Sequence, residues 1–327
     1  MGKYPQAKKV AGPARRLPNR PNFHLYTEDV RILLGIDTGD AFPPAIPMIL
    51  NLKFPDAELD LVHVIESVLP DGTFPQVGDS HPLSLMYKEK ERVAAAALDL
   101  AASKFAEARV PARTLVKHGD APLKLIQHAD QEGCDLIVAR TTSKGYFGSL
   151  FFGSVAKGLL NGAHQSLLIV KGEIPADKKL KVVFASDHSP YCDACVDLLA
   201  EMAPQGIEHL IVLTVNELSD EVAKLMTEGI EDRKNLGANW VEEQLEARNQ
   251  AICEKLAPLN ARFESRIVEG HTNKAIRKVM DETGADLLIM GAQGHGFFAR
   301  LTLGSKSFHQ VVSEPHSVLV LRPEFGS

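Results

Sequence analysis

Short apolar runs alternate with longer amphipathic stretches along most of the chain. In the second half the apolar runs lack a strict alternation of apolar and polar side chains, which is typical of strands buried on both faces. The stretches between them repeat apolar side chains every three to four residues, as amphipathic helices do. This alternation predicts a parallel sheet covered by helices on both faces. The predicted strands are 182–186, 209–215, 263–268, 287–290 and 318–321, and the clearest predicted helices are 193–202, 240–256 and 272–283.

The same pattern occurs twice, at a distance of 150 to 151 residues. An Asp opens an apolar run at Asp135 and again at Asp286, and in both places a Gly-Ser pair follows, at Gly153 and Gly304. Recurring landmarks in one order predict a tandem duplication of one domain. We therefore expect domains at 29–171 and 180–322, joined by a linker at 172–179. Further matching landmarks are 31–37 with 181–187, Gly119 with Gly270, and 166–170 with 317–321.

Two segments depart from the repeat. The first predicted helix of the first copy contains Pro43, Pro44 and Pro47, so we expect it to start late or to be distorted. Residues 1–28 begin with a basic stretch: the first 20 residues contain six Lys and Arg and three Pro, and no Asp or Glu. This composition favours a disordered basic arm, or alternatively an arm that contacts an anionic partner. Residues 323–327 form a short tail.

Composition and charge exclude several classes of protein. Apolar residues make up 45% of the chain and charged residues 24%, as in an average soluble globular protein with a large core. No apolar run reaches the roughly eighteen residues of a membrane-spanning helix, so we expect no membrane segment. The net charge of −6 gives no general attraction for nucleic acid. Four cysteines are too few for a disulfide scaffold and suit the reducing cytoplasm.

The segment from Gly291 to Ser305 is the strongest candidate for a ligand site. It follows a predicted strand and leads into a predicted helix, and ligands of open parallel sheets bind at such strand ends. Glycine lets the backbone approach a ligand closely. Gly304 and Ser305 at the helix start offer free N–H groups and the positive end of the helix dipole. Such a cradle binds phosphate without basic side chains, although isolated glycines at these positions also serve strand and helix geometry alone.

The spacing within this segment is more specific than its glycine content. The pattern Gly-x2-Gly-x9-Gly-Ser, formed by Gly291, Gly294, Gly304 and Ser305 after an apolar strand, closely resembles the nucleotide loop of the universal stress protein family. A strand that ends in Asp187 also resembles the family. The resemblance extends to strands that end at 63–64 and 214–215, and to the closing run 316–320. It covers both copies, 29–171 and 180–322.

The resemblance implies an α/β fold of two tandem, Rossmann-like domains, each with a five-stranded parallel sheet. The nucleotide-binding branch of the family holds ATP, alone or with Mg²⁺. Family members often pair through their last strands, so the two domains are expected to pair internally, with a homodimer of chains as a further hypothesis. Carried over residue by residue, adenine would meet Asp187 and the backbone of Val215, ribose would lie near Ala185 and Gly291, and phosphates would be held by Gly294, Gly304, Ser305 and Ser307. Ala185 stands where the family often has proline or valine.

The first copy departs from this motif. Arg140 stands in the place of Gly291 and Ser143 in the place of Gly294, while Gly153 and Ser154 remain. A guanidinium at position 140 should crowd the ribose side of a family-like site. We therefore predict one nucleotide per chain, in the C-terminal domain. The alternative is that Arg140 recruits a different anion.

Other residues suggest different chemistry. Cys192 and Cys195 form a CxxC at a predicted helix start, where thiol-redox proteins carry theirs, and with His188 they could contribute to a zinc site. The first copy has no thiols at the matching positions, and a second cysteine pair is lacking, so both interpretations are secondary. His295 could act as a general base only if it reached a water at the terminal phosphate.

The sequence therefore predicts a cytoplasmic stress-response or signalling module that binds ATP and an unknown protein partner. The P-loop pattern GxxxxGK[ST] is absent, as is the GxGxxG order of dinucleotide-binding dehydrogenases. Any ATP hydrolysis is then expected to be slow, and whether the protein is an enzyme stays open. The alternatives are a slow ATPase and a scaffold that binds no nucleotide.

Overall fold

The computed structural model of the chain describes residues 29–39, 44–66, 81–141, 153–217, 240–293 and 304–324. The N-terminal arm, Ser143, Gly294 and His295 lie outside the described residues.

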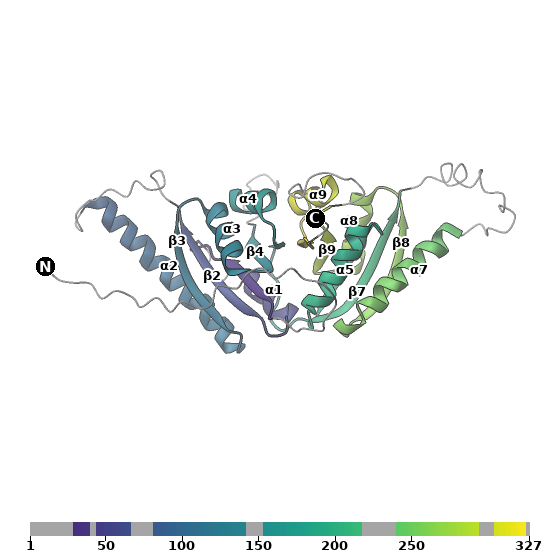
Figure 1. The fold of residues 1–327 in the computed structure, drawn as a ribbon, viewed down its shortest axis with the longest axis horizontal. Helices are drawn as coiled ribbons and strands as arrows, with labels where there is room; N and C mark the ends of the chain where they lie inside the picture. The colour runs from purple at the N-terminus through teal and green to yellow at the C-terminus, as the bar shows by residue number, and fades with distance from the viewer. Residues whose placement is uncertain are drawn as a thin grey trace.

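Within these described residues, the strands form one ten-stranded sheet in the order β3-β2-β1-β4-β5-β10-β9-β6-β7-β8. The two halves lie side by side in Figure 1. Neighbouring strands are parallel except at the centre, where β5 and β10 pair antiparallel. The predicted α/β fold of two five-stranded halves is thus confirmed. The strands of the first half are β1 (Arg31–Gly35), β2 (Glu58–Ile65), β3 (Ala112–His118), β4 (Leu136–Arg140) and β5 (Ser166–Val170); those of the second are β6 (Leu180–Ser186), β7 (Ile207–Asn216), β8 (Arg262–Glu269), β9 (Leu287–Gly291) and β10 (Ser317–Leu321).

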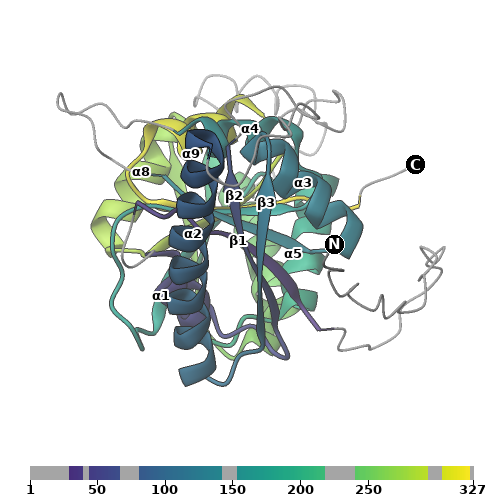
Figure 2. The same ribbon diagram turned by 90° about the vertical axis from the view of Figure 1, so that its left-hand side faces the viewer.

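Helices cover both faces of this sheet. In the first half α1 and α2 lie on one side of the strands, and α3 and α4 lie on the other (Figure 2). In the second half α5 packs with α7, and α8 packs with α9. The helices are α1 (Ala45–Leu52), α2 (Pro82–Glu107), α3 (Ala121–Glu132), α4 (Ser154–Gly162), α5 (Pro190–Met202), α7 (Trp240–Lys255), α8 (Thr272–Thr283) and α9 (Ser305–Ser313), with a 3₁₀ turn, η2, at Ala257–Leu259.

The late start predicted for the first helix is confirmed. α1 begins at Ala45 and has 8 residues, whereas its counterpart α5 has 13. Pro44 occupies the N-cap of α1 and Pro47 its first turn, where a missing N–H costs no helical hydrogen bond.

The repeated landmarks have structural reasons. The carboxylate of Asp135 accepts from the backbone N–H of Arg31 at 2.9 Å, and that of Asp286 accepts from Lys181 at 3.0 Å, so each Asp fixes the start of the neighbouring strand. The glycines after β3 and β8 have φ of 127° and 120°, a region that side-chain-bearing residues rarely adopt. These landmarks thus preserve the sheet in both halves.

The two halves meet at β5 and β10, in which every residue is buried. Each strand is followed by a cation that reaches the last helix of the other half. Lys171 donates through Nζ to the carbonyls of Val311 and Glu314 at the end of α9. Arg322 donates to the carbonyls of Leu160, at 2.6 Å, and Ala163 at the end of α4. Both cations therefore cap a helix C-terminus across the boundary between the halves.

A second contact joins the halves at the amino ends of the strands. The backbone N–H of Gly206 donates to the carbonyl of Leu52 at 2.9 Å, and a Cβ at position 206 would lie 1.6 Å from the carbonyl oxygen of Asn51. Asn51 also donates through Nδ2 to the carbonyl of Pro175, at 2.8 Å, in the segment between the halves. The C-terminus of α1 is thus fitted closely against the second half.

Candidate functional site

Three neighbouring strands of the second half, β9, β6 and β7, run parallel and so end at one edge of the sheet. Gly291 is the last residue of β9, Ala185 is the penultimate residue of β6, and Val215 is the penultimate residue of β7. α9 begins beside them because the backbone N–H of Gly304 donates to the carbonyl of Ala292 at 2.8 Å. The structure therefore brings the predicted strand ends and the predicted helix start together.

This edge has the geometry at which open parallel sheets bind ligands. β6 pairs with β7 on one side and with β9 on the other. The strands that follow β6 in the sequence therefore lie on both sides of it, which makes the gap between β6 and β9 a topological switch point. Ligands bind in the crevice beyond the carboxyl ends of the strands at such a point.

Asp187 follows β6 directly and is exposed. Its Oδ1 accepts from the backbone N–H of Ser189 at 3.0 Å and from the hydroxyl of Ser189 at 2.7 Å. Ser189 in turn caps α5, since its hydroxyl accepts from the backbone N–H of Cys192 at 3.1 Å. The carboxylate predicted to meet adenine is thus held in a fixed turn at the strand end.

A buried hydrogen-bonded chain supports this turn. His188 has a left-handed backbone with φ of 55°. Its Nδ1 lies 3.3 Å from the hydroxyl of Ser186, and its Nε2 lies 2.9 Å from the hydroxyl of Thr214. Thr214 donates onward to Oδ1 of Asn249 at 2.7 Å. The sequence indicated His188 only as a possible metal ligand, although a residue this close to the end of a predicted strand is also placed to fix the turn.

Gly291 has little free space around its Cα. A Cβ there would lie 3.1 Å from Sγ of Cys195 and 3.1 Å from Cε1 of Tyr191. Its carbonyl accepts from the hydroxyl of Ser307 at 2.8 Å. Ser307 is buried, and its hydroxyl joins α9 to β9. A ligand at the helix start could therefore contact Ser307 only through its backbone N–H.

The N-terminus of α9 completes the edge. Gly304 is its N-cap, with φ of −59° and ψ of 150°, and the cap forms no side-chain hydrogen bond. Ser305 is exposed at the first helical position. The first N–H groups of a helix have no partners within it, so an uncapped start of this kind suits an anion.

The first half has the same edge with a different residue at its centre. Arg140 ends β4 and pairs in register with Val170, as Gly291 ends β9 and pairs with Leu321. The structure thus establishes Arg140 as the counterpart of Gly291. The first half therefore carries a long cationic side chain at the position where the second half has none.

Burial disfavours a reactive thiol site at the cysteine pair. Cys192 and Cys195 are both buried within α5, and all four cysteines of the chain are unpaired. Burial raises the pKa of both thiols, and Cys192 donates to the hydroxyl of Ser186 at 3.3 Å. A protonated thiol is a poor nucleophile and a poor metal ligand. In the described ranges, no group of three or more His, Cys, Asp or Glu is arranged to hold a metal ion.

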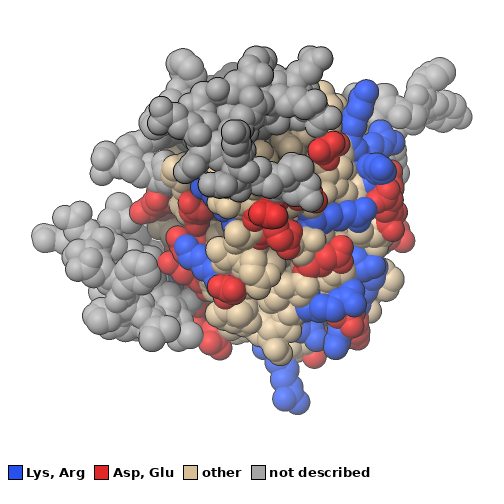
Figure 3. Space-filling model, turned by 90° about the vertical axis from the view of Figure 1, so that its right-hand side faces the viewer, with Lys and Arg blue, Asp and Glu red and all other residues tan. Residues whose placement is uncertain are grey.

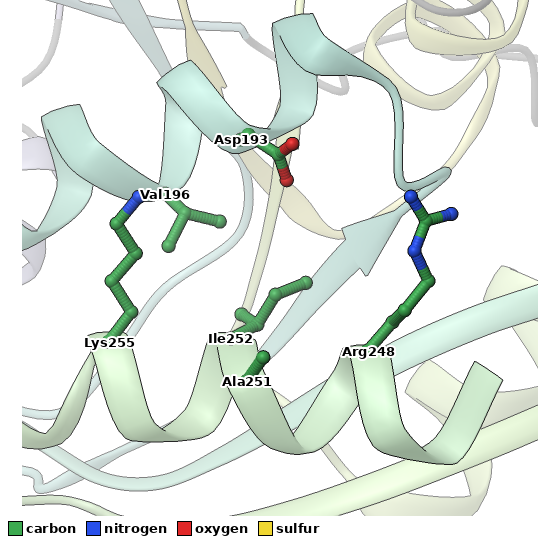
Figure 4. A pocket seen from close by; sticks show the side chains of 6 residues that line it. All are labelled: Asp193, Val196, Arg248, Ala251, Ile252 and Lys255. Atoms are coloured by element: carbon green, nitrogen blue, oxygen red, sulfur yellow. The ribbon is translucent and has the colours of Figure 1, made fainter. Parts of the chain in front are cut away.

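A small cleft lies between α5 and α7 (Figure 4). Its walls are apolar at Val196, Ala251 and Ile252, and charged at Asp193, Arg248 and Lys255. None of the predicted site residues lines it. The cleft therefore does not replace the strand-end edge as the candidate site.

The outer side of the second half carries charges of both signs (Figure 3). Acidic and basic side chains interleave in ion pairs, for example Arg266 with Glu282 and Lys278 with the same carboxylate. This face thus offers no continuous basic surface of the kind that binds nucleic acid. None of the helices in the described ranges combines the length and the apolar character of a membrane-spanning segment.

Comparison with known proteins gives one consistent result. A sequence profile of the universal stress protein family matches residues 30–171 and again residues 180–322. A universal stress protein of Mycolicibacterium smegmatis is 24% identical over 307 residues, which cover 89% of this chain and 97% of that protein. Another, from Methanocaldococcus jannaschii, is 28% identical over 142 residues, covering 43% of this chain and 81% of that protein.

Solved structures agree in fold. The crystal structure of a universal stress protein from Archaeoglobus fulgidus DSM 4304 gives a TM-score of 0.62 at 19% identity, covering 89% of this chain and 98% of that chain. A putative universal stress protein from Pseudomonas aeruginosa UCBPP-PA14 gives 0.58 at 15% identity, covering 91% and 95%. With two profile matches over almost the whole sequence, this chain belongs to the universal stress protein family, as a tandem pair of its domains.

Proposed function

We propose that this chain binds ATP, alone or with Mg²⁺, in its C-terminal domain and acts as a stress-response or signalling module. The observation that carries the proposal is the convergence of Asp187, the end of β7 at Val215, the end of β9 at Gly291 and the uncapped start of α9 at one edge of the sheet. Asp187 would accept from the adenine amino group, with the backbone of Val215 beside it, and the helix start at Gly304 and Ser305 would hold phosphates. Ala185 and Gly291 would lie near the ribose, Gly294 and Ser307 near the phosphates.

The two domains differ in this proposal. Arg140 fills the position of Gly291 in the first half, so the N-terminal domain binds no ATP and one nucleotide binds per chain. A titration that found two equivalent ATP sites would contradict this asymmetry.

An exchange of residues between the halves tests the site. Gly291→Arg should weaken ATP binding by roughly ten- to hundredfold, because a Cβ at this position meets Cys195 and Tyr191 and so displaces the end of β9 from the proposed ribose contact. Arg140→Gly is the matched control and should leave both the affinity and the stoichiometry of one unchanged. Circular dichroism of both variants establishes that they are folded. Equal affinity of Gly291→Arg and the unaltered chain would reject the site.

The same preparations separate the function classes. Mass spectrometry of the small molecule that co-purifies, followed by a phosphate-release assay, distinguishes three outcomes. Bound ATP with negligible turnover supports a binding module, slow release abolished by Gly291→Arg supports a slow ATPase, and a chain without nucleotide supports a scaffold.

Two further proposals concern location and assembly. Four unpaired, buried cysteines suit a reducing compartment, which supports the cytoplasm.

The strands through which family members often pair, β5 and β10, are already paired within this chain. A homodimer of chains would therefore use another surface, and light scattering that found a strict monomer would reject it.

A further inference from the structure

A small polar cluster joins three elements at the proposed site. Lys306 is the second residue of α9, and its Nζ lies 2.8 Å from Oε2 of Glu217 and 2.9 Å from the hydroxyl of Thr272. Glu217 follows β7, two residues after Val215, and Thr272 opens α8. The cluster thus links the phosphate end of the proposed site to the strand at its adenine end.

A lysine is unfavourable at this position of a helix. The start of a helix carries the positive end of its dipole, where cations are unfavourable and acidic side chains are preferred. Lys306 and Glu217 are about half exposed, at 50% and 46%, and exposed ion pairs contribute little because water screens them. Lys306 lies between Ser305 and Ser307, the proposed phosphate contacts. Its position therefore points to an anion that binds the ammonium group more strongly than the exposed carboxylate of Glu217 does.

Glu217 is anchored independently of Lys306. Its Oε1 accepts from the backbone N–H of Thr272 at 3.0 Å and also from the hydroxyl of Thr272. It thereby caps α8, because the N-cap residue His271 provides no side-chain hydrogen bond. Lys306, followed by Thr272, lowers the pKa of Glu217 to about 2, so the carboxylate is ionised at neutral pH. If the ammonium group of Lys306 moves away from Glu217, the contacts with Thr272 still hold the carboxylate in place.

The repeat shows that the cation is specific to the second half. At a distance of 151 residues, Lys306 corresponds to Val155, Thr272 to Ala121 and Glu217 to Glu66. The first half thus keeps the carboxylate but lacks the cation and the hydroxyl. It is also the half in which Arg140 replaces Gly291. The lysine therefore occurs together with the intact glycine position, which links it to the ligand rather than to the fold.

We propose that Lys306 is a phosphate-binding residue that exchanges Glu217 for the terminal phosphates of a nucleoside di- or triphosphate. The inference rests on the proposed function and adds to it a preference for polyphosphates. The four-carbon stem of lysine is flexible, and a terminal phosphate carries more charge than a carboxylate, so the exchange favours the ligand. Glu217 competes for the same ammonium group and sets the affinity. AMP and adenosine lack the terminal phosphates and gain nothing from Lys306.

Isothermal titration of the full chain with ATP, ADP and AMP tests this exchange. Lys306→Met should weaken ATP and ADP binding by about tenfold, the worth of a charge-assisted contact, and leave AMP unchanged. Glu217→Gln should strengthen ATP binding by a few-fold, because its amide still accepts from Thr272 but no longer holds Lys306 as an ion pair. Lys278→Met is the matched control, since it removes an exposed lysine, paired with Glu282 on α8, and should change no affinity.

Opposite signs for the two substitutions distinguish exchange from a structural ion pair. If the pair only held α9 in place, Lys306→Met and Glu217→Gln would weaken binding together, and AMP would weaken with ATP. That result, or ATP affinity unchanged in Lys306→Met, would overturn the inference and leave the proposed function intact. Failure of the unaltered chain to bind any of the three nucleotides would overturn both.

Discussion

His188 shows how a single residue stores strain at the proposed site. Its left-handed backbone, at φ of 55°, is costly for a residue with a Cβ. The ring offsets this cost, because Ser186 and Thr214 hold both of its nitrogens in the buried interior. The strained residue lies between Asp187, the proposed adenine contact, and Ser189, the cap of α5. Backbone strain of this kind is found at sites where a turn must be fixed in one conformation.

The two contributions of His188 are separable by substitution. His188→Ala removes the ring but keeps the Cβ, whereas His188→Gly removes both the ring and the backbone strain. Both variants should be less stable than the unaltered chain, and the glycine variant should be more stable than the alanine variant by about 1 kcal/mol. Chemical denaturation measures the difference. An alanine variant as stable as the glycine variant would mean that the backbone at position 188 is unstrained.

Residue roles were predictable only where the backbone determines them. The pairs Gly119 with Gly270 and Asp135 with Asp286 recur because strand starts and turns need them, so the repeat revealed them. The inward hydroxyl of Ser307 and the partners of Lys306 were not predictable. Their contacts join β9, β7 and α8, which are distant in the sequence. A one-dimensional pattern gives no information about such contacts.

Among the elements, α9 is held at both ends. Its start is fixed to β9 by Gly304 and Ser307, and its end is capped by Lys171 from the other half. Burial lowers the pKa of Lys171 from 10.5 to about 8, with the nearby Glu314 opposing the shift. The N-terminal half thus positions the helix that carries the proposed phosphate contacts.

The buried amine of Lys171 predicts a pH dependence of stability. Between pH 8 and 10.5 the unfolded chain binds a proton at Lys171 that the folded chain has released, so the free energy of unfolding should rise with pH in this window. Below pH 8 the full cost of the buried charge is present. Lys171→Met should lack this rise, so the difference between the two pH profiles isolates the residue. Parallel profiles would contradict the burial of the amine.

At the scale of the whole molecule, each copy of the duplicated domain contributes five strands to one continuous sheet. The sequence repeat predicted two domains, and the resemblance to the family implied that they pair internally. The antiparallel pairing of β5 with β10 confirms this pairing. The contact between Gly206 and the end of α1 has no counterpart in the repeat pattern, because it arises only when the two copies are joined side by side. It closes the boundary at the amino ends of the strands, as the capping cations do at the carboxyl ends of β5 and β10.

Gly206→Ala tests whether the halves depend on this contact. The new Cβ would lie 1.6 Å from the carbonyl oxygen of Asn51, so the backbone of one half must move, and the free energy of unfolding should fall by about 1–3 kcal/mol. Gly35→Ala is the matched control, because its Cβ would meet Leu125 at an ordinary 3.5 Å and should change stability by about 0.5 kcal/mol or less. Chemical denaturation measures the free energy of unfolding of both variants.

Proteolysis of the native proteins reports on the boundary between the halves. Loss of the hydrogen bond from Asn51 to Pro175 should speed cleavage between β5 and β6 in Gly206→Ala alone. Equal stability and equal cleavage of the two variants would show that the halves are held by β5, β10 and their capping cations without help from this contact.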